Sequence, residues 1–282
     1  MNFFLTGLGN LAENKEHVIN SVIKADQLCL DGALMPDHYM WGPEIGHSME
    51  NPYNTLETWT TLSYLAGQTS QIKLGTLVSP LPFRHPGILA KRLSTLDILS
   101  KGRVVLGVGA GWSKVEFEGY SKWGDAKYRV DKTIEALEIM TRLWAEDEVT
   151  YSSKFYNIKK AVLQPKPVQE PYPQLLFGSQ GKRMLKLTGK YGHICFIPPW
   201  AEERRDEIKE TVLESAEEYN RVNDVEFMLG FMGSQQYERQ EIIDRIEDAL
   251  DFGASYFTIA FPRETIEKSM EDFVSEVLPS YS

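Results

Sequence analysis

Short apolar runs alternate with helix-length segments along almost the whole chain. After the first run, for example, Val18, Val22 and Ala25 lie on one face of a helix. Runs that alternate with helices in this way are typical of βαβ units, whose strands form a parallel sheet. The predicted strands are Asn2–Leu8, Ala33–Met35, Ile72–Val78, Val104–Val108, Leu175–Phe177, His193–Ile197, Phe227–Met232 and Tyr256–Ala260. Eight such units favour a closed (β/α)8 TIM barrel over an open sheet, which commonly has about five to seven strands.

The expected helices fill the spaces between these strands. They are Lys15–Leu30, Leu56–Gly67, Ile88–Leu99, 181–189, 201–222, 237–252 and 265–278. The length of 282 residues is close to the ~250 typical of this barrel. Since no internal repeat or linker divides the chain, we expect residues 1–282 to form a single domain.

The fourth connection is unusually long and forms an insertion after strand 4, over about 112–173. It contains a predicted helix (Tyr128–Trp144), a predicted hairpin at 149–159 and a Pro-rich segment at 164–173 that leads back to the barrel. Long connections in compact domains are usually functional lids or oligomer contacts.

Composition excludes several classes of protein. The net charge is -10, from 30 basic and 40 acidic side chains, which argues against nucleic-acid binding. No apolar run reaches the ~18 residues of a membrane span, and the first residues lack the basic region of a signal peptide. Cys29 and Cys195 lie far apart without CxxC spacing, and the five histidines are scattered, so we expect no disulfide scaffold and no metal site. These features predict a soluble, cytoplasmic protein.

The charge is unevenly distributed. Residues 201–282 contain 21 acidic and 8 basic side chains (net -13). Residues 1–200 contain 19 acidic and 22 basic side chains (net +3). We therefore expect an anionic ligand to bind to the first two-thirds of the chain.

Asp37 and His38 follow the second predicted strand, with three aromatic or sulfur-containing side chains directly after them. Active sites of such barrels lie at the carboxyl ends of the strands, and a histidine can donate or accept a proton near neutral pH. We interpret the pair as catalytic; the alternative is that it only stabilises a turn.

Glycine-rich turns follow strands 4 and 5. The first, 107–112 (GVGAGW), has Trp112 where a dinucleotide-binding fingerprint needs glycine, but its glycines would let a flat ligand approach the backbone. The second, 178–183 (GSQGKR), opens a helix with free N–H groups and two cations, and predicts a phosphate site. Tight packing in the first turn, and helix capping by Ser179 in the second, are the alternatives. This turn does not match the G-x-S-x-G motif of a nucleophile elbow, because Phe177 stands two positions before Ser179, where the motif needs glycine.

Several of these segments resemble the luciferase-like monooxygenase family, and more narrowly its coenzyme F420-dependent oxidoreductases. The resemblance covers about 15–195 and is carried by the elements R-H-P at 84–86, L-D-x-L-S-x-G-R at 96–103 and G-V-G-A-G-W at 107–112. It implies a (β/α)8 barrel that holds a flavin or deazaflavin ring in its mouth.

The resemblance also implies roles for individual residues. Asp37 and His38 would lie beside the ring, with His38 the proton donor or acceptor, and a cis peptide at Leu77–Val78 would lie behind it. Near the cofactor the resemblance places Ala110, Gly111 and Trp112, and at its phosphate Gly178, Ser179, Gln180, Gly181 and Lys182. The family's sugar-phosphate dehydrogenases have a catalytic glutamate at the position of Trp112, so the resemblance argues against sugar-phosphate oxidation.

The function expected from these observations is hydride transfer between F420 and a small organic substrate. One alternative is an FMN-dependent monooxygenase that uses reduced flavin and oxygen; another is a cofactor-binding protein without turnover. The resemblance further suggests a homodimer or a larger homo-oligomer.

Overall fold

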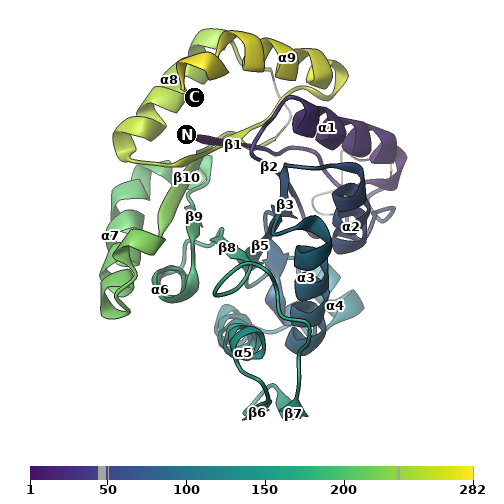
Figure 1. Cartoon of the computed structure of the whole chain (residues 1–282), viewed down its shortest axis with the longest axis vertical. Coiled ribbons are helices and arrows are strands. Elements are labelled where there is room, and N and C mark those ends of the chain that lie inside the picture. The colour runs from purple at the N-terminus through teal and green to yellow at the C-terminus, as the bar shows by residue number, and fades with distance from the viewer. Residues whose placement is uncertain (44–48, 50, 234–235, 282) are drawn as a thin grey trace.

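A closed ring of eight parallel strands forms the centre of the molecule (Figure 1). The computed structural model describes residues 1–43, 49, 51–233 and 236–281. Within them the strands of the ring are β1 (Asn2–Leu5), β2 (Gly32–Met35), β3 (Lys73–Thr76), β5 (Val104–Gly109), β8 (Gln174–Phe177), β9 (Ile194–Phe196), β10 (Glu226–Gly230) and β11 (Tyr256–Ile259). β1 pairs with both β2 and β11, and β3 pairs with β5, which closes the ring. The predicted TIM barrel is confirmed.

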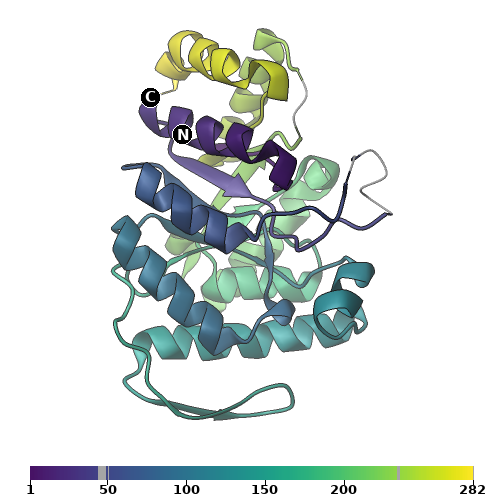
Figure 2. The ribbon, with the colours of Figure 1, turned by 90° about the vertical axis from the view of Figure 1, so that its right-hand side faces the viewer.

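Helices cover the outside of the ring. They are α1 (Lys15–Gln27), α2 (Thr58–Gln68), α3 (Pro86–Ser100), α6 (Lys182–Tyr191), α7 (Arg205–Glu218), α8 (Arg239–Phe252) and α9 (Ile266–Glu276). Figure 2 shows α1, α2 and α3 side by side on one flank of the barrel. This arrangement follows from the right-handed βαβ crossover, which returns each helix to the outer face of the sheet.

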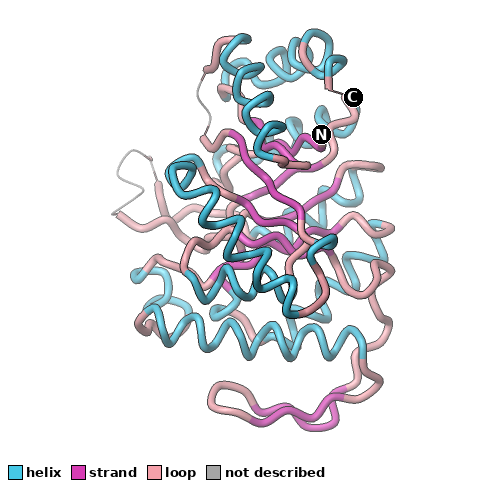
Figure 3. The backbone as a smooth tube through the Cα atoms, turned by 90° about the vertical axis from the view of Figure 1, so that its left-hand side faces the viewer, coloured by secondary structure: helices cyan, strands magenta, loops and turns pink. Residues whose placement is uncertain are grey.

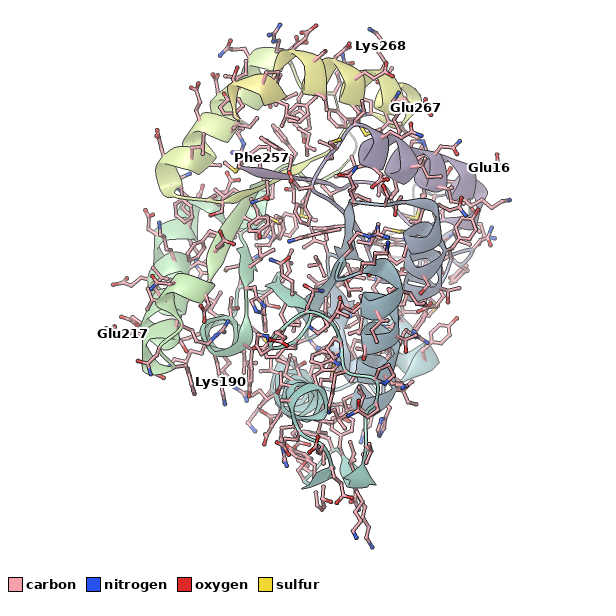
Figure 4. All side chains as sticks on the ribbon, viewed as in Figure 1. Glu16, Lys190, Glu217, Phe257, Glu267 and Lys268 are labelled. Carbon is pink, nitrogen blue, oxygen red and sulfur yellow. The ribbon has the colours of Figure 1, made fainter. Side chains whose placement is uncertain are left out.

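Apolar side chains fill both sides of the sheet. All six residues of β5 are buried, as expected for a strand covered on both faces. One cluster fills the inside of the ring, and it contains Phe4, Leu34, Val105, Leu176, Ile194, Phe196, Met228 and Tyr256. A larger cluster, which includes Phe257, lies between the strands and the helices. Figure 4 shows Phe257 in the interior and Glu217 and Glu267 on the outer surface.

The insertion consists of α4 (Lys114–Tyr120), α5 (Ala126–Ala145) and an antiparallel hairpin of β6 (Val149–Ser152) and β7 (Asn157–Ala161). Asp125 caps α5 by accepting a hydrogen bond from Tyr128 N at 2.7 Å. Figure 3 shows the hairpin standing away from the barrel. The predicted helix and hairpin are confirmed, whereas α4 was not predicted because its seven residues are too few to show a helical period.

The predicted bounds differ from the observed ones at several ends. α1 stops at Gln27 instead of Leu30, because Cys29 has a left-handed φ of 61° and Leu30 N bonds back to Ala25 O. The predicted helix 201–222 is divided into a 3-10 helix at Pro199–Arg204 and α7. β4 (Ser79–Pro80) is a short strand beside β5 that the sequence did not predict.

Candidate functional site

A cavity of about 340 Å³ opens at the carboxyl ends of the barrel strands. This volume lies within the range of about 300–1,000 Å³ for small-molecule sites. The residues that line it are His38, Leu77, Val78, Pro80, Phe83, Gly109, Ala110, Gly111, Trp112, Ser113, Glu116, Phe117, Gly178, Ser179, Gln180, Phe196, Pro198, Trp200 and Met232. They come from segments far apart in the sequence, so the fold assembles the site.

His38 follows β2 and lines the cavity. Its Nδ1 lies 2.8 Å from Glu116 Oε2, and its ring packs against Trp41 with 4.2 Å between centroids and against Trp112 with 5.3 Å. Two aromatic contacts and one hydrogen bond fix the orientation of the imidazole. Within the described residues, His38 Nε2 has no hydrogen-bond partner, which leaves this nitrogen for a ligand.

Glu116 lies in the first turn of α4 and its side chain is almost fully buried. Its Oε1 accepts a hydrogen bond from Tyr39 N at 2.6 Å, so both carboxylate oxygens are engaged. Because a carboxylate can only accept, the Nδ1 of His38 carries the hydrogen of this bond. Neutral His38 then has its lone pair on Nε2, and this atom can take a proton from a ligand.

Asp37 lies beneath His38 and does not line the cavity. Arg84 donates two hydrogen bonds to its carboxylate, Nη1 to Oδ2 at 2.8 Å and Nη2 to Oδ1 at 2.7 Å, and Ser79 Oγ donates a third at 2.5 Å. Burial opposes the charge of Arg84, but the neighbouring Asp37 carboxylate outweighs it and raises the pKa of the guanidinium. This buried pair fixes the segment that positions His38.

The Leu77–Val78 peptide is cis, as the family resemblance implies. Both side chains line the cavity, and Val78 lies between two glycines. A Cβ atom at Gly109 would lie 2.6 Å from Val78 Cγ2, and one at Gly178 would lie 2.9 Å from Val78 Cγ1. Glycine at both positions therefore allows Val78 to reach the cavity wall.

The turn after β5 forms another wall, and it contains Ala110, Gly111 and Trp112. Gly111 has a φ of +79°, and a Cβ there would lie 2.4 Å from the ring of Phe117. Only glycine satisfies both the left-handed backbone and this close packing. Trp112 is 53% exposed although it lines the cavity.

The turn after β8 leads into α6. Gly178, Ser179 and Gln180 line the cavity, whereas Gly181 is the N-cap and Lys182 is exposed outside it. No described residue accepts a hydrogen bond from the backbone N–H of Lys182 or Arg183. Ser179 does not cap the helix, and the Arg183 side chain pairs with Asp131 on α5 at 2.5 Å.

The structure thus brings most of the predicted residues together, namely His38, Leu77, Val78, Ala110, Gly111, Trp112, Gly178, Ser179 and Gln180. Sequence reasoning missed Glu116, because an acidic residue in a short segment without a helical period gives no signal of its own. It also missed Trp200 and Met232, which follow β9 and β10. These two could have been found, since the rule that sites lie at strand ends applies to every strand.

The family model for luciferase-like monooxygenases matches residues 3–272. The chain belongs to this luciferase-like monooxygenase family. A curated relative, the F420-dependent glucose-6-phosphate dehydrogenase of Microbacterium testaceum (strain StLB037), is 32% identical over 170 residues. That match covers 60% of this chain and 48% of the relative, so this luciferase-like chain spans about half of the relative's length.

Two solved structures show the same fold over the full length of both chains, each at 18% identity. One is an F420-dependent secondary alcohol dehydrogenase in complex with an F420-acetone adduct, with a TM-score of 0.84. The other is the monooxygenase RslO1 from Streptomyces bottropensis, with a TM-score of 0.81. This luciferase-like chain therefore shares its fold with one protein named as an F420-dependent dehydrogenase and one named as a monooxygenase.

The described residues contain neither a membrane-spanning helix nor a cluster of three or more metal-ligating side chains. None of their helices is long and apolar enough to cross a membrane. Their histidine, cysteine and acidic side chains form no group of three or more that could hold a metal ion. The cytoplasmic location expected from the sequence stays a prediction.

Proposed function

We propose that this luciferase-like protein is an F420-dependent oxidoreductase that transfers a hydride between the deazaflavin and a small organic substrate. The observation that carries the proposal is the oriented His38–Glu116 pair at the edge of a mainly apolar cavity. The choice of F420 is supported by relatives, several of which are named F420-dependent glucose-6-phosphate dehydrogenase.

The residues present fit such a cofactor. Val78 and the glycines beside it offer a flat apolar wall for a ring, together with Leu77 and the turn Ala110–Trp112. The free N–H groups at the start of α6 point to a phosphate at Gly178–Lys182, because a helix N-terminus carries about half a positive charge. In this proposal Ser179, Gln180 and Gly181 contact the phosphate, and Lys182 adds a charge from outside the cavity.

Bound F420 would supply the hydride acceptor or donor. The protein supplies the remaining functions. His38 Nε2 would exchange a proton with the substrate, while Glu116 holds the imidazole in the required tautomer. Asp37, which was expected to be catalytic, is assigned a positioning role because its carboxylate is held by Arg84 and Ser79. The apolar walls would exclude water from the reacting atoms.

The second candidate is an FMN-dependent monooxygenase, in which His38 would protonate or stabilise an oxygenated species. The family's description and the likeness to RslO1 favour it. A cofactor-binding protein without turnover would need no oriented proton carrier, so the His38–Glu116 pair argues against that alternative.

Separate titrations of the cofactor-free protein with F420 and FMN test the assignment. We expect F420 to bind with micromolar affinity or better and FMN to bind more weakly. Binding of FMN alone would replace the first candidate with the second. Binding of neither would exclude both.

We also propose that the protein is a homodimer or a larger homo-oligomer. Large apolar side chains are exposed on the adjacent helices α2 and α3, at Tyr64, Ile88 and Leu99. Such a surface on neighbouring helices is suited to contact with a second copy.

A further inference from the structure

The described residues that line the cavity include no lysine or arginine that could receive an anionic substrate. Among its lining residues in the described part of the chain, only His38 and Glu116 are titratable, and none is lysine or arginine. Glu116 is acidic, and both of its oxygens are already bonded to His38 and Tyr39. A second anion in this cavity, besides the cofactor phosphate proposed at the start of α6, would lose its hydration without gaining a cation.

The cations nearest in sequence to the site are engaged elsewhere. Arg84 is buried against Asp37, and Arg183 pairs with Asp131. Lys114, next to Ser113, is exposed and pairs with Glu118 at 3.8 Å. Lys182 lies at the position that the proposed function gives to the cofactor phosphate. The nine residues that the structure does not describe contain neither lysine nor arginine. Arg129 donates to the carbonyl oxygens of Gly111 and Gly124. In the described part of the chain these cations are thus paired or assigned to the cofactor, and none of them lines the cavity.

The mouth of the cavity exposes apolar surface instead. Trp112 and Trp200 both line the cavity, yet they are 53% and 70% exposed. Met232 and Phe83 add further apolar walls. Large aromatic side chains that are exposed at a cavity mouth favour ligands that cover them with apolar surface.

We propose that the substrate is a small, uncharged and mainly apolar molecule with one hydroxyl or carbonyl group. The inference rests on the proposed function. In oxidation, the carbon that bears the hydroxyl loses a hydride to F420, the hydroxyl proton passes to His38 Nε2, and a carbonyl product remains; reduction is the reverse. Phosphorylated sugars, which the names of several relatives specify, are disfavoured, because the free N–H groups at α6 are assigned to the cofactor phosphate and no lysine or arginine lines the cavity for a second one. The molecule is small because ring and substrate share about 340 Å³.

A matched pair of ligands isolates the effect of charge. Cyclohexanecarboxamide and cyclohexanecarboxylate have nearly the same shape, and their binding to the full-length protein can be measured by calorimetry with and without saturating F420. We expect the amide to bind at least tenfold more tightly in both conditions. Equal or tighter binding of the carboxylate, or no binding of either at millimolar concentration, would overturn the proposal.

A charge-gain variant shows whether the ligands occupy this cavity. Trp200→Arg should strengthen carboxylate binding at least tenfold, whereas the control Trp200→Phe should keep the preference for the amide. An unchanged preference in Trp200→Arg would contradict the proposed site. Failure of F420 to bind would instead contradict the proposed function, and the ligand preference without cofactor would still be measured.

Turnover gives an independent readout in the protein with F420 bound. We expect cyclohexanol to reduce the cofactor and glucose 6-phosphate to leave it oxidised. Faster reduction by glucose 6-phosphate would overturn the substrate class while supporting the proposed cofactor.

Discussion

At the scale of single residues, the tautomer of His38 decides what the site can do. Glu116 accepts from Nδ1, so in the proposed mechanism Nε2 is the atom that would take the substrate's proton. In Glu116→Gln the amide can donate to Nδ1 and favour the hydrogen on Nε2. We expect kcat to fall by ~10- to 100-fold in both directions, because oxidation needs the lone pair on Nε2 and reduction needs the imidazolium that the Glu116 carboxylate stabilises.

The test is steady-state kinetics in both directions for Glu116→Gln, with His38→Ala as the reference. His38→Ala should lower turnover by ~10²-fold or more in both directions, with little change in cofactor affinity. Unchanged turnover of Glu116→Gln in both directions would show that Glu116 does not set the tautomer on which the reaction depends.

The buried Arg84–Asp37 pair leads to a second prediction at the scale of single residues. Both charges are buried, and removal of one partner leaves the other uncompensated. Arg84→Met should lower the free energy of unfolding by about 3–5 kcal/mol, whereas the double variant Arg84→Met/Asp37→Asn should lower it by less. Urea titrations of the single and double variants measure the difference. Additive losses would mean that the two side chains are not coupled.

At the scale of elements, the sequence predicted every strand of the ring, because buried strands with β-branched residues such as β5 give a strong pattern. It did not predict α4, whose position depends on the burial of Phe117 and Glu116 instead of on a local period. For the same reason it missed Glu116 as the partner of His38: a contact between residues 78 positions apart is visible only after the barrel closes.

His193 precedes β9 and accepts a hydrogen bond from Leu175 N at 3.0 Å. Burial lowers its pKa to about 4, below the ordinary value of 6.5. Below pH 6.5 the unfolded chain therefore binds more protons than the folded one, and stability is lost as the pH falls toward 4. When the pH falls from 7 to 4.5, the free energy of unfolding of His193→Gln should decrease by about 2 kcal/mol less than that of the parent. Urea titrations at both pH values test this; equal losses would show that His193 titrates alike in both states.

The turn between β8 and α6 makes a prediction about cofactor binding. Gly178→Val would push its side chain against Val78, so we expect cofactor affinity to fall by tenfold or more. Lys182→Ala should weaken binding by at most about 1–2 kcal/mol, because in the proposed site backbone N–H groups would hold the phosphate. Titrations with F420 and FMN measure both effects.

Gly181→Ala is the control for the Gly178 variant. A Cβ at Gly181 meets no atom within 4 Å, so this variant leaves the barrel undisturbed. A loss of affinity in Gly181→Ala would therefore report direct contact with the cofactor. Unchanged affinity in Gly178→Val, Lys182→Ala and Gly181→Ala together would place the phosphate elsewhere.

At the scale of the whole molecule, the charge asymmetry expected from the sequence has a structural counterpart. Residues 201–282, with a net charge of -13, contribute α7, α8 and α9 to the outer surface. The proposed phosphate site lies instead at the start of α6, in the less acidic part of the chain. Because α6 packs against the acidic helix α7, an anion there would depend on the N–H groups and cations at the start of α6 and not on the field of the whole molecule.

The last prediction concerns self-association and follows from the apolar side chains exposed on the outer surface. Ile88 and Leu99 lie on one face of α3 and are 65% and 73% exposed. If α2 and α3 contact a second copy, Ile88→Lys/Leu99→Lys places unpaired charges in the interface and should convert the oligomer to a monomer. Val162→Lys/Val168→Lys is the matched control, because these valines are also exposed but belong to the insertion.

Light scattering after size exclusion gives the mass of each variant at micromolar concentration. We expect the parent and the Val162/Val168 variant to be oligomers and the Ile88/Leu99 variant to be a monomer. Dissociation of the Val162/Val168 variant alone would move the interface to the insertion, the other interpretation of that long connection. Cofactor titration of the monomer then separates assembly from catalysis: the cavity is lined within one chain, so we expect F420 affinity to be retained.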